Sequence, residues 1–348
     1  MDVVVLAVAL VVILVGAELF TNGIEWFGRH LDLAEGAVGS VLAAVGTALP
    51  ETMIPLVAIV IAGGAASTEV GVGAILGAPF MLGTLAMFVT GVAILAFRRR
   101  RRQGVELVVD QAVLLHDLRW FVLSYGLAIG AAFLPSGSEI AKAGVAIVLL
   151  ALYAWYVRGH LVAEPGEHDE ALGPLRLGRL DRGRGLHPVP RLRVVGVQVI
   201  LALACILLGA VFFVGAIEHL AASLGVGSAL LALVVAPFAT ELPEKLNSVI
   251  WVRQGKDTLA IGNITGAMVF QSAIPTSVAL LFAPAAWSVG TGSALSFLSA
   301  AIAVASLAAI FVPLRIRGRL TGRGLAIGGI FYLAYLALVI VTLAGAAA

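Results

Sequence analysis

Long apolar segments recur from one end of this chain to the other, and each is long enough to cross a lipid bilayer. A transmembrane helix needs about 20 mainly apolar residues to cross about 30 Å of hydrocarbon. Ten segments meet this condition: residues 3–28, 34–62, 69–97, 118–135, 139–157, 194–221, 226–252, 258–283, 289–314 and 324–345. Only 12% of the 348 residues are charged, whereas about 25% is usual in a soluble domain. The sequence therefore predicts an all-α integral membrane protein with ten spans.

The basic residues are concentrated in alternate connections between these spans. Of the 22 Lys and Arg, all but Lys142 and Lys245 fall there, including the arginine run at 98–102 and the segment 315–323. The positive-inside rule places such loops in the cytoplasm. We therefore expect a multi-pass protein of the plasma membrane with both termini outside. The run at 98–102 is interpreted as a stop and orientation signal, with binding to anionic lipid as the alternative.

The second half of the chain repeats the first. Residues 16–51, GAELFTNGIEWFGRHLDLAEGAVGSVLAAVGTALPE, align without a gap with residues 209–244, GAVFFVGAIEHLAASLGVGSALLALVVAPFATELPE. Further on, GAILGA at 73–78 matches GNITGA at 262–267. Five spans in each half is an odd number, so the two halves enter the membrane from opposite sides. Such an inverted repeat is typical of secondary transporters.

The repeat divides the chain into three parts. A first five-helix repeat covers residues 1–158, a linker covers 159–193, and a second five-helix repeat covers 194–348. The linker is rich in Gly, Pro and Arg, and we expect it to be a flexible cytoplasmic joint between the halves. It has few acids and no calcium-loop spacing, which argues against a regulatory ion sensor.

Each repeat carries a Pro-Glu pair inside an apolar span, with Glu51 in the first half and Glu244 in the second. A proline removes a backbone donor, which frees carbonyl oxygens one turn upstream, near residues 44–46 and 237–239. A charged side chain at the bilayer centre costs roughly 2.5–3.5 kcal/mol, so it normally faces a cavity or a partner. Carbonyl, hydroxyl and carboxylate oxygens together suit hard cations. The motifs therefore predict a site for sodium, calcium or a proton.

These motifs resemble a known family. GTALPE followed by GAILGA, and ATELPE followed by GNITGA, are similar to the two signature repeats of the sodium/calcium exchanger family, the cation/calcium antiporters. The resemblance implies two inverted five-helix repeats whose second, third, seventh and eighth helices enclose the ions. It implies exchange of calcium or sodium against sodium or protons by alternating access. The ligands that it implies are the side chains of Thr47, Glu51, Thr240 and Glu244 and the backbone oxygens of Ala44 and Pro237.

The chain departs from the family pattern at several ligand positions. Where the family usually has Ser after the motif threonine, this chain has Ala48 and Glu241. Where the family has Ser followed four residues later by a polar or acidic ligand, it has Ala78 with Leu82 and Ala267 with Gln271. Glu241 and Gln271 thus remain candidate ligands, and the first half lacks several oxygens. The pattern favours a simplified or proton-coupled exchange.

Lys245 directly follows Glu244 within the seventh span, and Glu241 precedes it by four residues. This is the spacing of an ion pair on one helical face. We hypothesise a buried Glu241–Lys245 pair that leaves Glu51 and Glu244 as the net charge of the site. Two interpretations remain open: the pair is purely structural, or the ammonium replaces a bound cation in one transport state and so modulates the site.

Two further sequence features concern residues outside the Pro-Glu motifs. Glu18 and Asn22 lie four residues apart on the first span, and structural or cavity-mouth roles are favoured for such residues over ligation. Gly73 with Gly77, and Gly262 with Gly266, let the third and eighth helices approach closely.

The sequence supports other classes of function less well than cation exchange. A non-transporting membrane scaffold or sensor is the alternative function. The sequence has no nucleophile–base pair, HExxH or phosphate-binding loop, so an enzyme is not expected. We expect no cofactor, with cations as cargo. The partners are inorganic cations and the lipid bilayer, and nucleic acid is excluded because the arginines border membrane spans.

Overall fold

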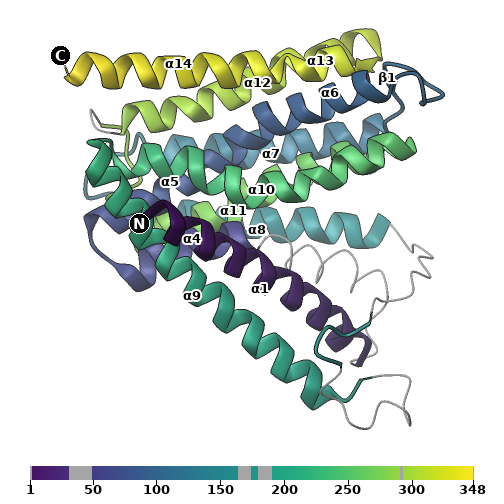
Figure 1. Cartoon of the computed structure of the whole chain (residues 1–348). Coiled ribbons are helices and arrows are strands. Elements are labelled where there is room, and N and C mark those ends of the chain that lie inside the picture. Colours follow the sequence, from purple (N-terminus) through teal and green to yellow (C-terminus); the bar gives the residue numbers. More distant parts are fainter. Residues whose placement is uncertain (1, 31–48, 164–173, 179–189, 291–292, 348) are drawn as a thin grey trace.

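The computed structural model is almost entirely helical (Figure 1) and describes residues 2–30, 49–163, 174–178, 190–290 and 293–347. The helices of the first half are α1 (Asp2–His30), α4 (Leu49–Leu56), α5 (Ala65–Met81), α6 (Met87–Phe97), α7 (Gln111–Ala131) and α8 (Glu139–Ala163). Those of the second half are α9 (Leu192–Leu224), α10 (Ser228–Gln254), α11 (Asp257–Phe282), α12 (Ala294–Arg317), α13 (Gly322–Ala326) and α14 (Gly328–Ala347). Two π-helical segments, η2 (Val57–Ala62) and η3 (Leu82–Ala86), and two short antiparallel strands, β1 (Glu106–Leu107) and β2 (Leu320–Thr321), complete the described chain.

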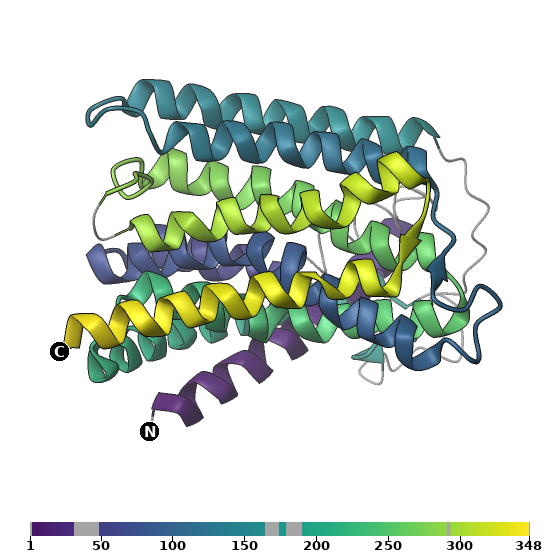
Figure 2. The ribbon, with the colours of Figure 1, turned by 90° about the horizontal axis from the view of Figure 1, so that it is seen from above.

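The described residues contain eight helices that are long and apolar enough to cross a membrane, with α5 to α6 counted as one. They coincide with eight of the predicted spans. The predicted span 34–62 lies partly outside the described residues, and α4 with η2 covers its end. The predicted span 226–252 is helical from Ser228 onward, as α10. Both chain ends lie at one end of the bundle, and the loop between α6 and β1 lies at the other (Figures 1 and 2).

Helices α1 and α9 pack along each other and run obliquely to the rest of the bundle (Figure 1). Their contact is reciprocal. A Cβ built on Gly16 would lie 2.8 Å from Cγ1 of Ile206, and one built on Gly209 would lie 2.7 Å from Cγ1 of Ile13. Gly16 and Gly209 are equivalent positions of the sequence repeat, and so are Ile13 and Ile206. Only a residue without a side chain lets the two helices come this close.

Helix α5 meets α10 through the glycines that the sequence singled out. A Cβ on Gly73 would lie 2.1 Å from the carbonyl oxygen of Ala229, and one on Gly77 would lie 2.1 Å from that of Leu233. The predicted close approach of the third helix is therefore confirmed, with α10 as the neighbour. On α11, nothing in the described part of the chain lies within 4 Å of a Cβ on Gly262. The close approach expected of the eighth helix is not seen there.

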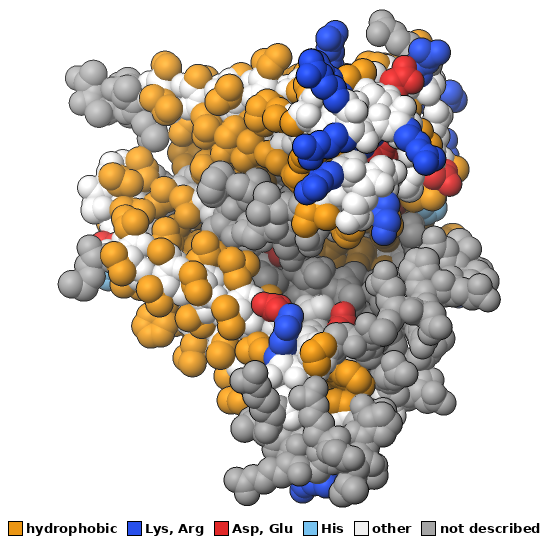
Figure 3. Space-filling view, turned by 45° about the vertical axis from the view of Figure 1, so that its right-hand side comes forward, with side chains coloured by type: hydrophobic (Ala, Val, Ile, Leu, Met, Phe, Trp, Pro, Cys, Tyr) orange, Lys and Arg blue, Asp and Glu red, His pale blue; other side chains and the backbone are white. Residues whose placement is uncertain are grey.

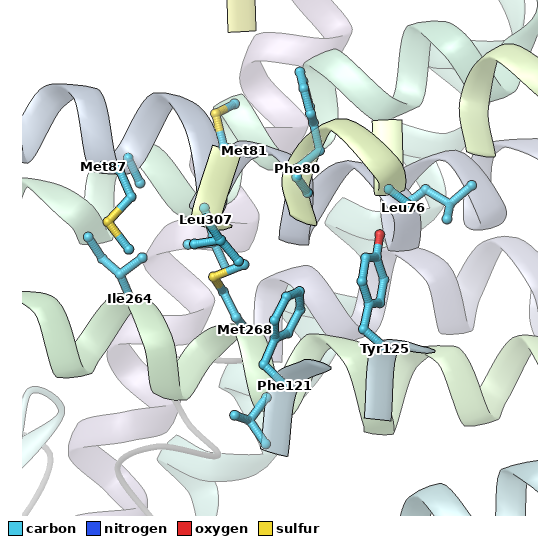
Figure 4. Packing of buried hydrophobic residues seen from close by; sticks show 14 of the residues in the cluster. Leu76, Phe80, Met81, Met87, Phe121, Tyr125, Ile264, Met268 and Leu307 are labelled. Atoms are coloured by element: carbon cyan, nitrogen blue, oxygen red, sulfur yellow. The ribbon is translucent and has the colours of Figure 1, made fainter. Parts of the chain in front are cut away.

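The core lies between α5, α6, α7, α11 and α12 (Figure 4). Helices α1 and α9 do not contribute to it, because their buried apolar side chains form a second cluster with α4, the start of α5 and the start of α10. The labelled residues in this core are Leu76, Phe80, Met81, Met87, Phe121, Tyr125, Ile264, Met268 and Leu307. This cluster fixes α11 against the third span, and α11 carries one of the predicted ligands.

A buried ion pair joins the loop after α6 to the start of α11. Both guanidinium nitrogens of Arg101 donate to the carboxylate of Asp257 at 2.7 Å, and both side chains are fully buried. Arg101 also donates to the carbonyl oxygens of Val252 and Glu106. Arg101 therefore has a structural role that was not predicted for this run, whereas the other four arginines of the run are exposed. A planar guanidinium with five donors suits such a site.

Candidate cation site

The first motif glutamate lies on a short helix. Glu51 is in the first turn of α4, and its side chain is only 8% exposed. Pro50 directly precedes it in the described part of this helix. Thr47 and Ala44 fall outside the described residues. The chain continues from α4 directly into the π-helical segment η2, and π-bulges are frequent at functional sites.

The second motif lies within α10. This helix runs from Ser228 to Gln254 without interruption. Pro237 has no N–H to offer the carbonyl of Leu233, four residues earlier. It is against this carbonyl that Gly77 of α5 packs. Pro237 therefore allows a close contact between α10 and α5.

Thr240 is the motif residue of α10 whose side chain the structure describes. It is 1% exposed, and its hydroxyl donates to the carbonyl oxygen of Ala236 at 3.0 Å. The hydroxyl oxygen keeps lone pairs that can accept a bond or hold a cation. The side chains of Glu241, Glu244 and Lys245 lie outside the described residues, so the Glu241–Lys245 pair stays a hypothesis.

Gln271 on α11 is 1% exposed, and neither its amide nitrogen nor its amide oxygen has a hydrogen-bond partner among the described residues. A buried polar group without a partner costs about 1–3 kcal/mol. The hydroxyl of the next residue, Ser272, does have a partner, because it donates to the carbonyl oxygen of Val269 at 2.8 Å. Gln271 is therefore the α11 side chain that is available for an occupant of the site.

The four elements α4, α5, α10 and α11 all contact one another. Glu51, Thr240 and Gln271 therefore lie on helices that pack against one another. Among the residues that the structure describes, no group of three or more His, Cys, Asp or Glu could hold a metal ion. Among the predicted ligand side chains, the structure describes one carboxylate, Glu51, and the neutral oxygens of Thr240 and Gln271. The side chains of the other predicted ligands lie outside the described residues.

Sequence reasoning missed a buried carboxylate at Asp117. This side chain is 2% exposed, and it accepts hydrogen bonds from Tyr156 of α8 at 2.9 Å and from Thr265 of α11 at 2.6 Å. Thr265 belongs to the repeated GNITGA motif. The predicted span began at residue 118, after Asp117, but α7 begins at Gln111. The sequence feature that could have identified this residue is an acidic side chain directly before the predicted span 118–135. Its role is to join α11 to α7 and α8.

Sequence reasoning also missed the π-helical segment η3. It follows Pro79 in the third span, and the carbonyl oxygen of Gly83 within it accepts a hydrogen bond from Ser306 of α12 at 2.7 Å. A π-turn shifts the backbone hydrogen bonds by one residue and leaves carbonyls for other donors. Proline in the middle of an apolar span was the signal for it.

Comparison with known proteins places these observations in a family. The family described as "Sodium/calcium exchanger protein" matches residues 1–161 and 194–344. A relative described as "Putative antiporter CaxA", from Alkalimonas amylolytica, is 25% identical over 282 residues, which is 80% of this chain and 79% of the relative. A second relative, the uncharacterized membrane protein MJ0091 of Methanocaldococcus jannaschii, is 44% identical over 55 residues, 16% of this chain and 18% of the relative.

Solved structures share the fold. The H⁺/Ca²⁺ exchanger CAX superposes with a TM-score of 0.71 at 16% sequence identity, covering 96% of this chain and 82% of that chain. A structure of the sodium-calcium exchanger NCX_Mj superposes with a TM-score of 0.53 at 18% identity and covers 97% of both chains. The family match spans both halves and leaves out only the linker and the chain's last residues. The chain belongs to the sodium/calcium exchanger family.

Proposed function

We propose that this protein is a secondary active antiporter that exchanges calcium, sodium or both against sodium or protons by alternating access. The observation that carries the proposal is the buried amide of Gln271 without a described partner, on a helix that packs against the helix of the buried Glu51. Protein interiors rarely keep such a group without an occupant. Cations are the cargo in this proposal, with no cofactor and no enzymatic step.

The proposed architecture is ten spans in two inverted five-helix repeats. What supports it is the reciprocal contact of α1 and α9, in which each helix places its repeat-equivalent glycine against the isoleucine of the other. A two-fold relation between the repeats produces such a pair of contacts. In folds of this kind the ions bind near the membrane midplane, where the two repeats meet.

The proposed ion site combines both Pro-Glu motifs. Glu51 and Glu244 supply the charge, which one divalent cation, two monovalent cations or two protons would balance. Lys245 modulates that charge. The neutral ligands and the additional acid of the proposal are Thr47, Thr240, Gln271, the backbone oxygens of Ala44 and Pro237, and Glu241.

Proton coupling is supported by missing oxygens in the first half. Ala48, Ala78 and Leu82 offer no side-chain ligand, and a full set of sodium sites needs more oxygens than remain. A desolvated glutamate binds a proton more readily, because burial disfavours its charged form. The closer fold likeness to the H⁺/Ca²⁺ exchanger CAX than to NCX_Mj points the same way.

The proposed location is the plasma membrane, with both termini outside. Figure 3 shows Lys and Arg side chains gathered over one end of the molecule, next to broad apolar surfaces. We refer to this end, where the loops after α6, α10 and α12 lie, as the arginine-rich end. The positive-inside rule assigns it to the cytoplasm.

The test is transport in proteoliposomes. We expect the wild-type protein to move calcium or sodium when a sodium or pH gradient is imposed. Glu51→Gln keeps the size of the side chain but removes its charge, and we expect at least about a 100-fold loss of flux, since even outer-shell changes cost 10–100-fold. Glu69→Gln is the matched control, because Glu69 is exposed on α5.

Two results would contradict the proposal. One is a wild-type protein that moves neither ion under either gradient. The other is a Glu51→Gln variant whose flux equals that of the Glu69→Gln control. Comparing the sodium and pH gradients identifies the coupling ion.

A further inference from the structure

Helix α11 is bonded to α7 at two points that lie seven residues apart. At the first, the backbone amide of Asp110, the residue before α7, donates to the hydroxyl of Thr258 at 3.1 Å. At the second, the hydroxyl of Thr265 donates to Oδ2 of Asp117 at 2.6 Å. Seven residues are close to two turns of an α-helix. The same face of α11 therefore meets α7 at both points.

The other faces of α11 meet different elements. A Cβ built on Gly266 would lie 3.5 Å from the hydroxyl oxygen of Tyr156, so this face meets α8. A Cβ built on Gly83 would lie 3.4 Å from Cε of Met268, so that face meets the third span. Figure 4 shows Met268 within the apolar core. Three faces of α11 are thus assigned to three neighbours by described contacts.

The helical periodicity gives the direction of Gln271. This residue follows Ile264 by seven positions and therefore shares the face of Ile264, which belongs to the same buried core as the third span (Figure 4). Counted from Thr265, Gln271 lies about 120° away around the helix axis, because six residues advance the side-chain direction by about 600°. Thr265 is held by α7, whereas Gln271 lies on the side of the third span.

The carboxyl group of Asp117 is a fixed anchor for this contact. It is 2% exposed, and its other oxygen, Oδ1, accepts a hydrogen bond from Tyr156 of α8 at 2.9 Å. Each oxygen thus has a hydroxyl donor from a different helix, and the group cannot turn without losing one of them. The bond between Asp117 and Thr265 therefore fixes the rotation of α11 relative to α7 and α8.

The anchor and the candidate ligand occur in the same repeat. The equivalents of Thr265 and Gln271 in the third span are Leu76 and Leu82, which are both fully buried and apolar. Apolar contacts are non-directional, so a helix that only packs does not depend on a polar anchor. A helix that presents an amide needs its direction fixed, because polar contacts weaken steeply when their angle or distance changes.

We propose that Asp117 is a positioning residue for cation binding, which acts through Thr265 to hold the amide of Gln271 at the ion site. This inference rests on the proposed function. A helix with its side chains has a radius of about 5–6 Å, so a rotation of about 10° moves the end of a side chain by about 1 Å. A misplacement of this size is enough to weaken a preorganised site.

The test measures flux in proteoliposomes and thermal unfolding in detergent for variants of the full chain. Thr265→Val keeps the shape of the side chain and removes its donor, Thr265→Cys keeps a weak donor and Thr265→Ser keeps a full one. Tyr156→Phe is the matched control, because it removes the other hydroxyl bonded to Asp117 and leaves the bond to α11 in place. A double variant, Thr265→Val with Gln271→Leu, shows whether the two residues act on one contact.

We expect the ion concentration that gives half-maximal flux to rise about three- to tenfold in Thr265→Val, since the loss of one contact at the site sets the upper limit at about tenfold. Maximal flux should change by less than about twofold, because a contact that serves binding changes the apparent affinity rather than the maximal rate. Thr265→Cys should be intermediate, and Thr265→Ser should match the wild type.

The control and the double variant separate positioning from stability. Tyr156→Phe should lower the melting temperature and leave the half-maximal concentration at the wild-type value. The double variant should match Gln271→Leu alone, because residues that act on one contact are not additive.

Three results would overturn the positioning role: an unchanged half-maximal concentration in Thr265→Val, an equal rise in Tyr156→Phe, or a double variant whose effect is the product of the single effects. If Thr265→Val does not fold, Thr265→Cys and Thr265→Ser carry the same comparison. Unchanged affinity in Gln271→Leu alone would overturn this inference and leave the antiporter intact. A wild-type protein without flux under either gradient would overturn the proposed function itself.

Discussion

The third span and its repeat equivalent α11 share a backbone path but not their chemistry. At three equivalent buried positions α11 carries a polar side chain where the third span carries an apolar one: Thr265 for Leu76, Gln271 for Leu82 and Thr276 for Met87. All three apolar members belong to the buried core cluster, and Leu76 and Met87 are labelled in Figure 4. Of the polar members, Thr265 donates a hydrogen bond to Asp117, and the side chain of Gln271 has no described partner. Thr276 donates to the backbone carbonyl oxygen of Gln271 within α11. At these three positions the third span contributes apolar packing and α11 contributes polar groups.

The two spans also differ in backbone. The third span changes from α5 to the π-helical η3 after Pro79, whereas α11 stays α-helical across Pro275. The π-turn gives the third span a spare carbonyl at Gly83, which Ser306 satisfies. The third span thus offers a backbone carbonyl at Gly83, whereas α11 offers the side chain of Gln271. A gene-level repeat therefore does not require a symmetric site.

The largest effect should come from breaking the ion pair that joins these two spans. Arg101 follows α6 and Asp257 begins α11, and Arg101→Ala would leave a buried carboxylate without its partner. We expect the free energy of unfolding to fall by about 3–5 kcal/mol, measured by thermal unfolding in detergent. Arg99→Ala, in the exposed part of the same run, should stay close to wild type. Equal melting temperatures for the two variants would contradict the structural role of Arg101.

The glycines of the two repeats should respond unequally. Gly73→Ala places a methyl group 2.1 Å from the carbonyl oxygen of Ala229, and overpacking of this kind costs about 1–3 kcal/mol. Gly262→Ala, at the equivalent position, meets nothing within 4 Å in the described structure. It should be neutral or slightly stabilising, because alanine is the better helix former. Thermal unfolding of the two variants side by side decides this, and equal losses would mean that α11 is packed as tightly as α5.

The smallest effect should follow from making α11 resemble the third span. Gln271→Leu copies Leu82, and we expect about a tenfold loss of apparent cation affinity, which corresponds to losing one hydrogen bond or ion contact of about 1.4 kcal/mol. The melting temperature should hold or rise, because a buried amide without a described partner is replaced by an apolar side chain. The readout is the ion concentration that gives half-maximal flux.

Ser272→Ala is the control for this prediction. Its hydroxyl bonds within its own helix, so its loss should leave the apparent affinity unchanged. Unchanged affinity in Gln271→Leu as well would remove this residue from the site. The asymmetry between the repeats would then be a matter of packing alone.

The positions of the spans followed from the sequence, since apolar length is a local property. Helix α9 was predicted at residues 194–221 and is found at Leu192–Leu224, while α7 begins several residues before its predicted start. The error at α7 hid Asp117, because a polar first turn lowers the apolar average although tertiary contacts keep it helical. Glu51 and Thr240 were proposed from the repeated Pro-Glu motifs, and Gln271 was proposed from the comparison with the family pattern.

By itself the sequence determined that this protein is a repeated bundle of membrane-spanning helices, and it identified the residues of a candidate cation site. Hydropathy and repetition require no knowledge of distant contacts. Only the tertiary structure showed that Arg101 is a buried partner of Asp257, that Gly77 faces α10, and that residues 174–178 close onto α1 and α9. Each of these depends on a partner far away in the chain, and the spacing of residues along a sequence carries no information about such partners.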